Sequence, residues 1–127
     1  MKTILLTGCT LGLLLGAQAH ANQAPLDGTL SKIANAKSIT LGYRDASVPF
    51  SYVGDNSGKP MGYSVDLASK IVERIQQKTG VADLKVKYNL VTSQTRIPLV
   101  QNGTVDLECG STGVTAERQK QVAFSYG

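Results

Sequence analysis

The sequence is poor in the residue types that build metal centres and catalytic triads. Its 127 residues include two cysteines, Cys9 and Cys109, and a single histidine, His20. Cys9 and His20 both lie near the N-terminus, so the rest of the chain has one cysteine and no histidine. This composition excludes a cysteine–histidine metal cluster and a serine–histidine–aspartate triad, and it indicates no cofactor.

Long runs of like charge and long apolar runs are missing as well. The 13 basic and 9 acidic residues are dispersed along the chain, which argues against a nucleic-acid partner. The longest apolar run, residues 4–16, is shorter than the ~20 apolar residues that a membrane-spanning helix needs. Without repeats or low-complexity tracts, the length suits one domain with its own core.

The N-terminus has the three parts of a secretory signal. Lys2 supplies a positive start, residues 4–16 form the apolar run, and residues 19–21 are the small-residue cleavage site. We therefore expect residues 1–21 to be a signal peptide cleaved after Ala21, and residues 22–127 to form the mature domain with a formal net charge of +3. An alternative is a lipoprotein cleavage box at residues 6–9, but the apolar run continues well beyond it.

Export implies an oxidising compartment, where a lone cysteine is unusual. Cys109 is then either a buried free thiol or one half of a disulfide whose partner is missing.

The remaining pattern alternates strands and helices. We expect strands at residues 38–43, 84–91 and 105–109 and the start of another at 122–124. We expect a first short helix that is capped by Thr29 or Ser31. Three more helices are expected at residues 64–80, 94–102 and 115–120, and Ser64 and Thr115 are the predicted caps of the first and the last of these. Residues 84–91 alternate apolar and polar side chains, which predicts a strand with one wet face near a sheet edge. The order predicts an α/β fold with a mostly parallel sheet flanked by helices.

Ligands bind at the carboxyl ends of the strands in such sheets. Three segments follow those ends, residues 43–52, 91–96 and 110–118, and they carry positive and hydroxyl side chains. The candidate ligand-binding residues are Arg44, Ser93, Arg96, Ser111, Thr112, Gly113 and Arg118. Arginine grips a carboxylate with two parallel hydrogen bonds, and helix N-termini offer free N–H groups. Three arginines match a ligand with two carboxylates.

The same segments resemble a known family. Residues 62–68 (GYSVDLA) and 111–119 (STGVTAERQ) look like motifs of the bacterial extracellular solute-binding proteins, family 3. Residues 44–52, 92–103 and 108–112 resemble its glutamate/aspartate-binding members. The resemblance, which covers roughly residues 28–127, implies the type II periplasmic binding protein fold, in which two α/β lobes close on a ligand. The chain would be the first lobe only, and its end at Gly127 suggests a fragment.

The resemblance also implies roles. Arg118 would hold the α-carboxylate of glutamate or aspartate, helped by Ser111 and the backbone of Gly113. Arg44, Arg96 and Ser93 would hold the side-chain carboxylate. The subgroup usually has threonine at the position of Gly113, so one hydroxyl contact is lost. The second lobe would bind the ammonium group, and a second cysteine there would be a partner for Cys109. The implied location is the periplasm, and the implied partner is an ABC permease of the inner membrane.

Two other classes share this fold. A secreted enzyme such as a dehydratase would need an acid or base in the cleft, and Asp45 and Glu117 are the nearby candidates. A sensor domain of a membrane receptor or kinase would need a membrane span.

Overall fold

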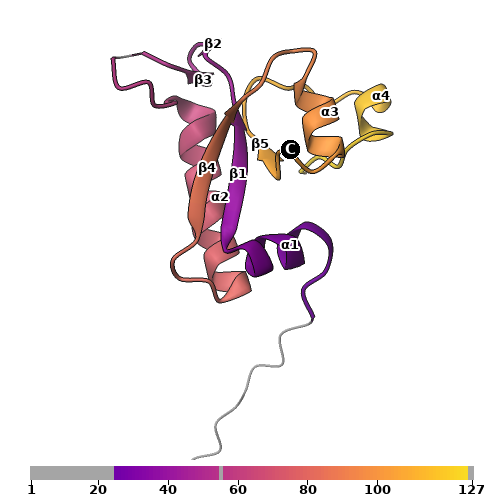
Figure 1. The fold of residues 1–127 in the computed structure, drawn as a ribbon. Helices are drawn as coiled ribbons and strands as arrows, with labels where there is room; N and C mark the ends of the chain where they lie inside the picture. The colour runs from indigo at the N-terminus through magenta and orange to yellow at the C-terminus, as the bar shows by residue number, and fades with distance from the viewer. Residues whose placement is uncertain (1–24, 55, 126–127) are drawn as a thin grey trace, which may run out of the picture.

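The computed structural model describes residues 25–54 and 56–125, so the expected signal peptide lies outside the described residues (Figure 1). The helices are α1 (Gly28–Ala36), α2 (Tyr63–Thr79), α3 (Arg96–Gln101) and α4 (Ala116–Gln119). The strands are β1 (Ser38–Tyr43), β2 (Ala46–Ser47), β3 (Ser51–Tyr52), β4 (Lys85–Leu90) and β5 (Leu107–Glu108). In the part of the chain that the structure describes, no helix is long and apolar enough to cross a membrane.

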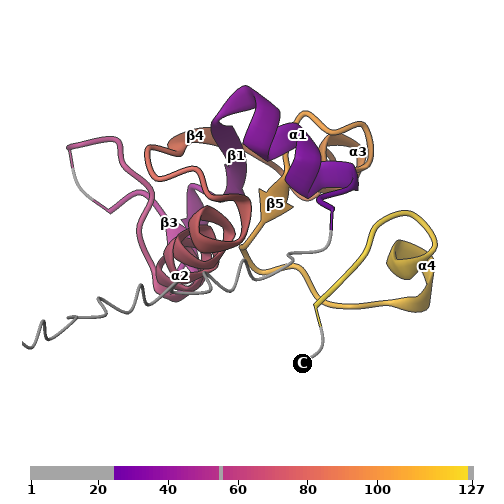
Figure 2. The ribbon, with the colours of Figure 1, turned by 90° about the horizontal axis from the view of Figure 1, so that it is seen from below.

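The central sheet is parallel, as the alternation of strands and helices predicts. Its order is β4-β1-β5, with Ile39 opposite Val86 and Gly42 opposite Glu108. A short antiparallel pair, β2 and β3, follows β1 and was not among the predicted strands. Figure 2 shows α2 and α3 on opposite sides of β1 and β5, with α4 away from the sheet.

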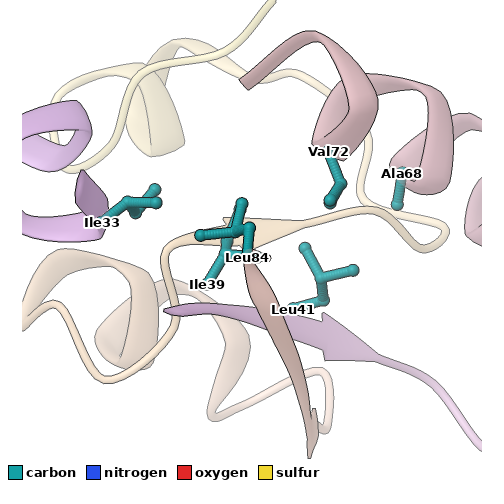
Figure 3. Packing of buried hydrophobic residues seen from close by; sticks show 6 residues of the cluster. All are labelled: Ile33, Ile39, Leu41, Ala68, Val72 and Leu84. Carbon is teal, nitrogen blue, oxygen red and sulfur yellow. The ribbon is translucent and has the colours of Figure 1, made fainter. Parts of the chain in front are cut away.

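The core forms where α1 and α2 meet one face of the sheet. Ile39 and Leu41 alternate along β1 and lie in one cluster with Ala68 and Val72, which are four residues apart on α2 (Figure 3). Ile33 of α1 and Leu84 complete this cluster. On the opposite face Val91 and Val105 are buried beside Gly42. A Cβ at Gly42 would lie 3.0 Å from a methyl group of Val105, so a larger residue there would crowd this side of the sheet.

Two predicted helix caps are wrong. Helix α1 begins at Gly28 after Asp27, one or more residues before Thr29 or Ser31. Helix α2 begins after Gly62, not after Ser64, whose hydroxyl donates to the carbonyl of Gly110 at 2.8 Å. Gly62 has φ 119°, and a Cβ there would lie 2.6 Å from the Phe50 carbonyl oxygen. A tertiary contact thus sets this helix start, and a local capping rule cannot detect it.

Other boundaries differ because strands need partners. Residues 122–124 form no strand, since no described segment pairs with them. Strand β5 is confined to Leu107–Glu108 for the same reason, and α3 is shorter than the predicted 94–102. Two expectations are confirmed: Gly80 ends α2 with φ 71°, and the Thr115 side chain caps α4 by accepting from the backbone N–H of Arg118.

Strand β4 lies at a sheet edge, as its alternation predicts. The prediction of a single wet face is wrong, because Val86, Tyr88 and Leu90 are 38, 47 and 47% exposed. The rings of Tyr88 and Tyr43 make an edge-to-face contact, with centroids 6.2 Å apart, which covers this face in part. No described residue covers the rest.

Asp106 joins three parts of the fold, and its loss is expected to be costly. One carboxylate oxygen lies 2.7 Å from Nζ of Lys32, and the other accepts from the backbone N–H of Thr40 at 2.8 Å. The Asp106 side chain is 4% exposed, whereas that of Lys32 is 51% exposed. Asp106→Ala should lower the free energy of unfolding by about 1–3 kcal/mol, because it leaves the part-buried backbone N–H of Thr40 in β1 without an acceptor.

Lys32→Ala is the matched control. It removes the ion pair and the hydrogen bond from Nζ of Lys32 to the carbonyl of Gly103 but leaves the bond between Asp106 and the N–H of Thr40, so it should cost less than Asp106→Ala. Urea unfolding of the two variants measures the difference. Equal losses would show that the ion pair, not the contact with the β1 backbone, carries the stabilisation.

Candidate functional site

The carboxyl ends of the three parallel strands bring the predicted segments to one edge of the sheet. Arg44 directly follows β1, Ser93 follows β4, and Gly110 follows β5. A guanidinium nitrogen of Arg44 donates to the hydroxyl of Ser93 at 3.1 Å. Two candidate residues that are 49 positions apart in the sequence are therefore in direct contact.

Buried hydroxyl groups fix the backbone on both sides of this contact. The Ser51 hydroxyl is fully buried, accepts from the N–H of Arg44 at 2.8 Å and donates to its carbonyl at 3.1 Å. In the second segment, the hydroxyl of Thr95 accepts from the backbone N–H of Thr92 at 2.9 Å. This turn presents Ser93 just before α3 begins at Arg96.

Arg96 is buried, with 7% exposure. Its Nε and one terminal nitrogen are buried without a hydrogen-bond partner among the described residues. Burial lowers the pKa of Arg96 from its ordinary value, Glu108 opposes that shift, and the positive charges of Arg118 and Arg44 lower it further. The charges of all three arginines therefore interact, as expected for side chains that face one region.

The third segment contacts the first through Ser111 and is held internally by Arg118. The hydroxyl of Ser111 contacts that of Ser47 at 3.3 Å, and the guanidinium of Arg118 donates to the carbonyl of Gly113 at 2.7 Å. The Thr112 hydroxyl is buried without a partner among the described residues. A Cβ at Gly113 would meet nothing within 4 Å, so this position faces open space.

A groove of about 380 Å³ runs beside β5 between α2 and α3. Arg96 and Thr112 line it, together with Glu108 and the apolar side chains of Leu67 and Ile71. The other five candidates, namely Arg44, Ser93, Ser111, Gly113 and Arg118, are not among its lining residues. The candidate site is thus an open edge of the sheet next to this groove, and it is not an enclosed pocket.

Cys109 lies partly buried beside the site and has no disulfide partner among the described residues. Burial raises the pKa of its thiol to about 11, and the neighbouring Glu108 adds to this rise. The described residues contain no group of histidine, cysteine, aspartate and glutamate side chains able to hold a metal ion.

Sequence reasoning did not identify three polar residues that organise the site. Ser51 and Ser64 bond to the backbone of site loops, and Glu108 lies next to the arginines. The sequence places these residues in or beside predicted strands and helices, but serine and glutamate are common there. Only the three-dimensional arrangement distinguishes them.

The model of the bacterial extracellular solute-binding proteins, family 3, matches residues 39–127. The chain belongs to this family. The match includes the three segments that form the candidate site. It agrees with the resemblance carried by residues 62–68 and 111–119.

The curated relatives that are more than 50% identical to the chain are named as glutamate/aspartate-binding proteins. The L-glutamate/L-aspartate-binding protein of Pseudomonas aeruginosa is 58% identical over 97% of this chain and 40% of its own length. The glutamate/aspartate import solute-binding protein of Escherichia coli K12 is 52% identical over 91% of this chain and 38% of its own length. The chain therefore spans about two fifths of the length of the relatives it matches.

A solved structure of a single lobe has the same fold. The arginine-bound form of domain 1 from TmArgBP, crystallised as a point mutant, superposes with a TM-score of 0.64 and 28% identity. The alignment covers 76% of this chain and 69% of that domain. The fold is that of type II periplasmic binding proteins, and the chain corresponds to about one lobe, as the sequence resemblance implied.

Proposed function

We propose that the chain is the first lobe of the periplasmic substrate-binding component of an ABC amino-acid importer, and that it binds glutamate or aspartate without chemical change. The observation that carries this proposal is the arginine cluster. Arg96 is buried with unpaired N–H groups, and the charges of Arg44 and Arg118 act on it. Buried N–H donors without partners are costly, and an anionic ligand that binds at this edge would satisfy them.

A ligand with two carboxylates satisfies the cluster best. Arg118, with Ser111, Thr112 and the backbone of Gly113, binds the α-carboxylate in this proposal. Arg44, Arg96 and Ser93 bind the side-chain carboxylate. The Arg44–Ser93 contact already places two of these donors side by side. Charge-assisted bonds from arginine to carboxylate supply both affinity and orientation.

The names of the relatives support the same ligand class. Two proteins that are more than 50% identical to the chain are named for glutamate and aspartate. Their names describe binding proteins and not enzymes. The acid–base candidates agree with this reading: Glu117 is 78% exposed and paired with Lys120 at 3.0 Å, which suits a surface ion pair.

Membership of this family also supports proposals about lobe closure and about transport of the ligand. A second lobe would close over the ligand and exclude water, which strengthens each ion pair. The closed form would then dock on a permease of the inner membrane. The signal peptide at residues 1–21 would direct the chain to the periplasm.

The lobe alone is proposed to bind ligand. Domain 1 from TmArgBP was crystallised in an arginine-bound form, so a single lobe of this fold can hold an amino acid. The test is a thermal-shift screen of this chain against the twenty amino acids. Glutamate and aspartate should raise Tm, and glutamine and arginine should not. A larger shift with a basic or amide amino acid would overturn the proposal.

A further inference from the structure

The carboxylate of Glu108 lies within the candidate site and is not used by the proposed ligand contacts. Glu108 lies on β5 opposite Gly42 of β1, so its side chain points to the same face of the sheet as Gly42. One carboxylate oxygen, Oε1, is buried and has no hydrogen-bond partner among the described residues. An unpaired buried carboxylate oxygen is uncommon and calls for an explanation.

The fold leaves room for this side chain at two glycines. A Cβ at Gly42 would lie 3.2 Å from Cγ of Glu108. A Cβ at Gly110 would lie 2.5 Å from Oε1 of Glu108 and 3.1 Å from Cγ of Arg44. A side chain at Gly110 would displace the carboxylate, and one at Gly42 would crowd it, so both glycines favour a carboxylate held beside Arg44.

The carboxylate is near the arginines without pairing to them. The ion pairs within the described ranges are Lys32–Asp106, Lys70–Glu73 and Lys120–Glu117, and Glu108 is in none of them. Its negative charge nevertheless acts on Arg96, because it opposes part of the lowering of that residue's pKa that burial causes. The guanidinium of Arg96 thus keeps free N–H donors while a negative charge stands close by.

We propose that Glu108 is a positioning residue that acts as an internal counter-charge, stabilising the arginine cluster when no ligand is bound and limiting its affinity for a dicarboxylate. This inference rests on the proposed function for its second half only. In the unliganded lobe, Glu108 offsets one of three positive charges. When a ligand carboxylate arrives at Arg96, Glu108 repels it.

Glu108→Gln keeps the shape of the side chain and removes its charge. The proposal predicts that this variant has a higher affinity for glutamate but a lower stability without ligand. Glutamate should bind about three- to tenfold more tightly, because one repulsive unit charge several ångströms away is removed. Glutamine affinity should change much less, so the glutamate-to-glutamine ratio rises. The unliganded chain should lose about 5 °C in Tm. A purely structural role would weaken both ligands alike.

Glu117→Gln is the matched control, because it removes one negative charge from an exposed side chain of the same lobe. It should change neither the ratio nor Tm appreciably. Calorimetric titration of the full chain with glutamate and with glutamine measures the ratio for each variant. A ratio that is unchanged or lower in Glu108→Gln, while the wild-type chain binds glutamate, would overturn the affinity half.

The stability half is tested without any ligand. If Glu108 acts on Arg96, the Tm loss from Glu108→Gln should largely disappear in an Arg96→Met background. Thermal unfolding of the two single variants and the double variant gives this coupling. Equal losses in both backgrounds would refute the counter-charge role, whatever the ligand proves to be. If the wild type fails to bind glutamate while this coupling is found, the proposed function fails and the counter-charge stands.

Discussion

Arg96→Met is expected to lower the affinity for glutamate by roughly 30-fold to a few thousand-fold, which corresponds to about 2–5 kcal/mol for losing one partner of a buried charge pair. Arg96 is 7% exposed, and two of its nitrogens have no partner among the described residues, so its donors are available to a ligand carboxylate. Methionine fills similar space without donors or charge. Titration calorimetry with glutamate measures the loss.

The same substitution should stabilise the unliganded chain. It removes a buried cation with unpaired N–H groups. Burial and the repulsion from Arg118 and Arg44 together outweigh the attraction of Glu108, so the free energy of unfolding should rise by about 1–3 kcal/mol. Urea unfolding without ligand measures this gain. Arg74→Met is the control, because Arg74 bonds only to Gln77 on the exposed side of α2 and should change neither quantity. A loss of stability together with unchanged glutamate affinity in Arg96→Met would place Arg96 in the structure and outside the binding site.

Arg118→Ala is expected to weaken every amino acid, by about 2–5 kcal/mol, because all amino acids share the α-carboxylate that Arg118 is proposed to hold. Its guanidinium is anchored on the carbonyl of Gly113 at 2.7 Å, next to open space in which a ligand can lie. The comparison variant is Arg44→Ala, which should weaken glutamate and aspartate and leave amides with similar affinity. The two variants therefore differ in pattern and not only in size.

The measurement is a titration of each variant with glutamate, aspartate and glutamine. Arg118→Ala should shift all three dissociation constants in the same direction, whereas Arg44→Ala should bring glutamate and glutamine closer together. If the two variants gave the same pattern, the assignment of one carboxylate to each arginine would be wrong.

The sheet was predictable because its strands carry a local signal. Ile39 and Leu41 alternate with polar or small residues, and α2 repeats its apolar side chains at helical spacing, so the order and the parallel sheet follow. From a parallel sheet, the edge that carries the site follows as well. Arg44 and Ser93 could therefore be placed together before any coordinates were known.

The features that sequence reasoning missed depend on distant contacts. The start of α2 at Gly62 results from the close approach of Phe50, which is 12 positions earlier in the sequence. The exposure of Tyr88 and Leu90 depends on which neighbours cover β4, and alternation cannot supply that. Glu108 looks like an ordinary strand residue until Gly42 and Gly110 are seen around it. In each case at least one deciding contact comes from a segment that is distant in the sequence.

The central claim is that Arg44, Arg96 and Arg118 of this one lobe together recognise two carboxylates. The most direct measurement compares glutamate with glutamine in calorimetric titrations of the wild-type chain, because these ligands differ only in the charge of the side-chain group. The account predicts that glutamate binds at least about 30-fold more tightly, since glutamine leaves a buried arginine unpaired. Equal affinities for the two ligands would contradict it.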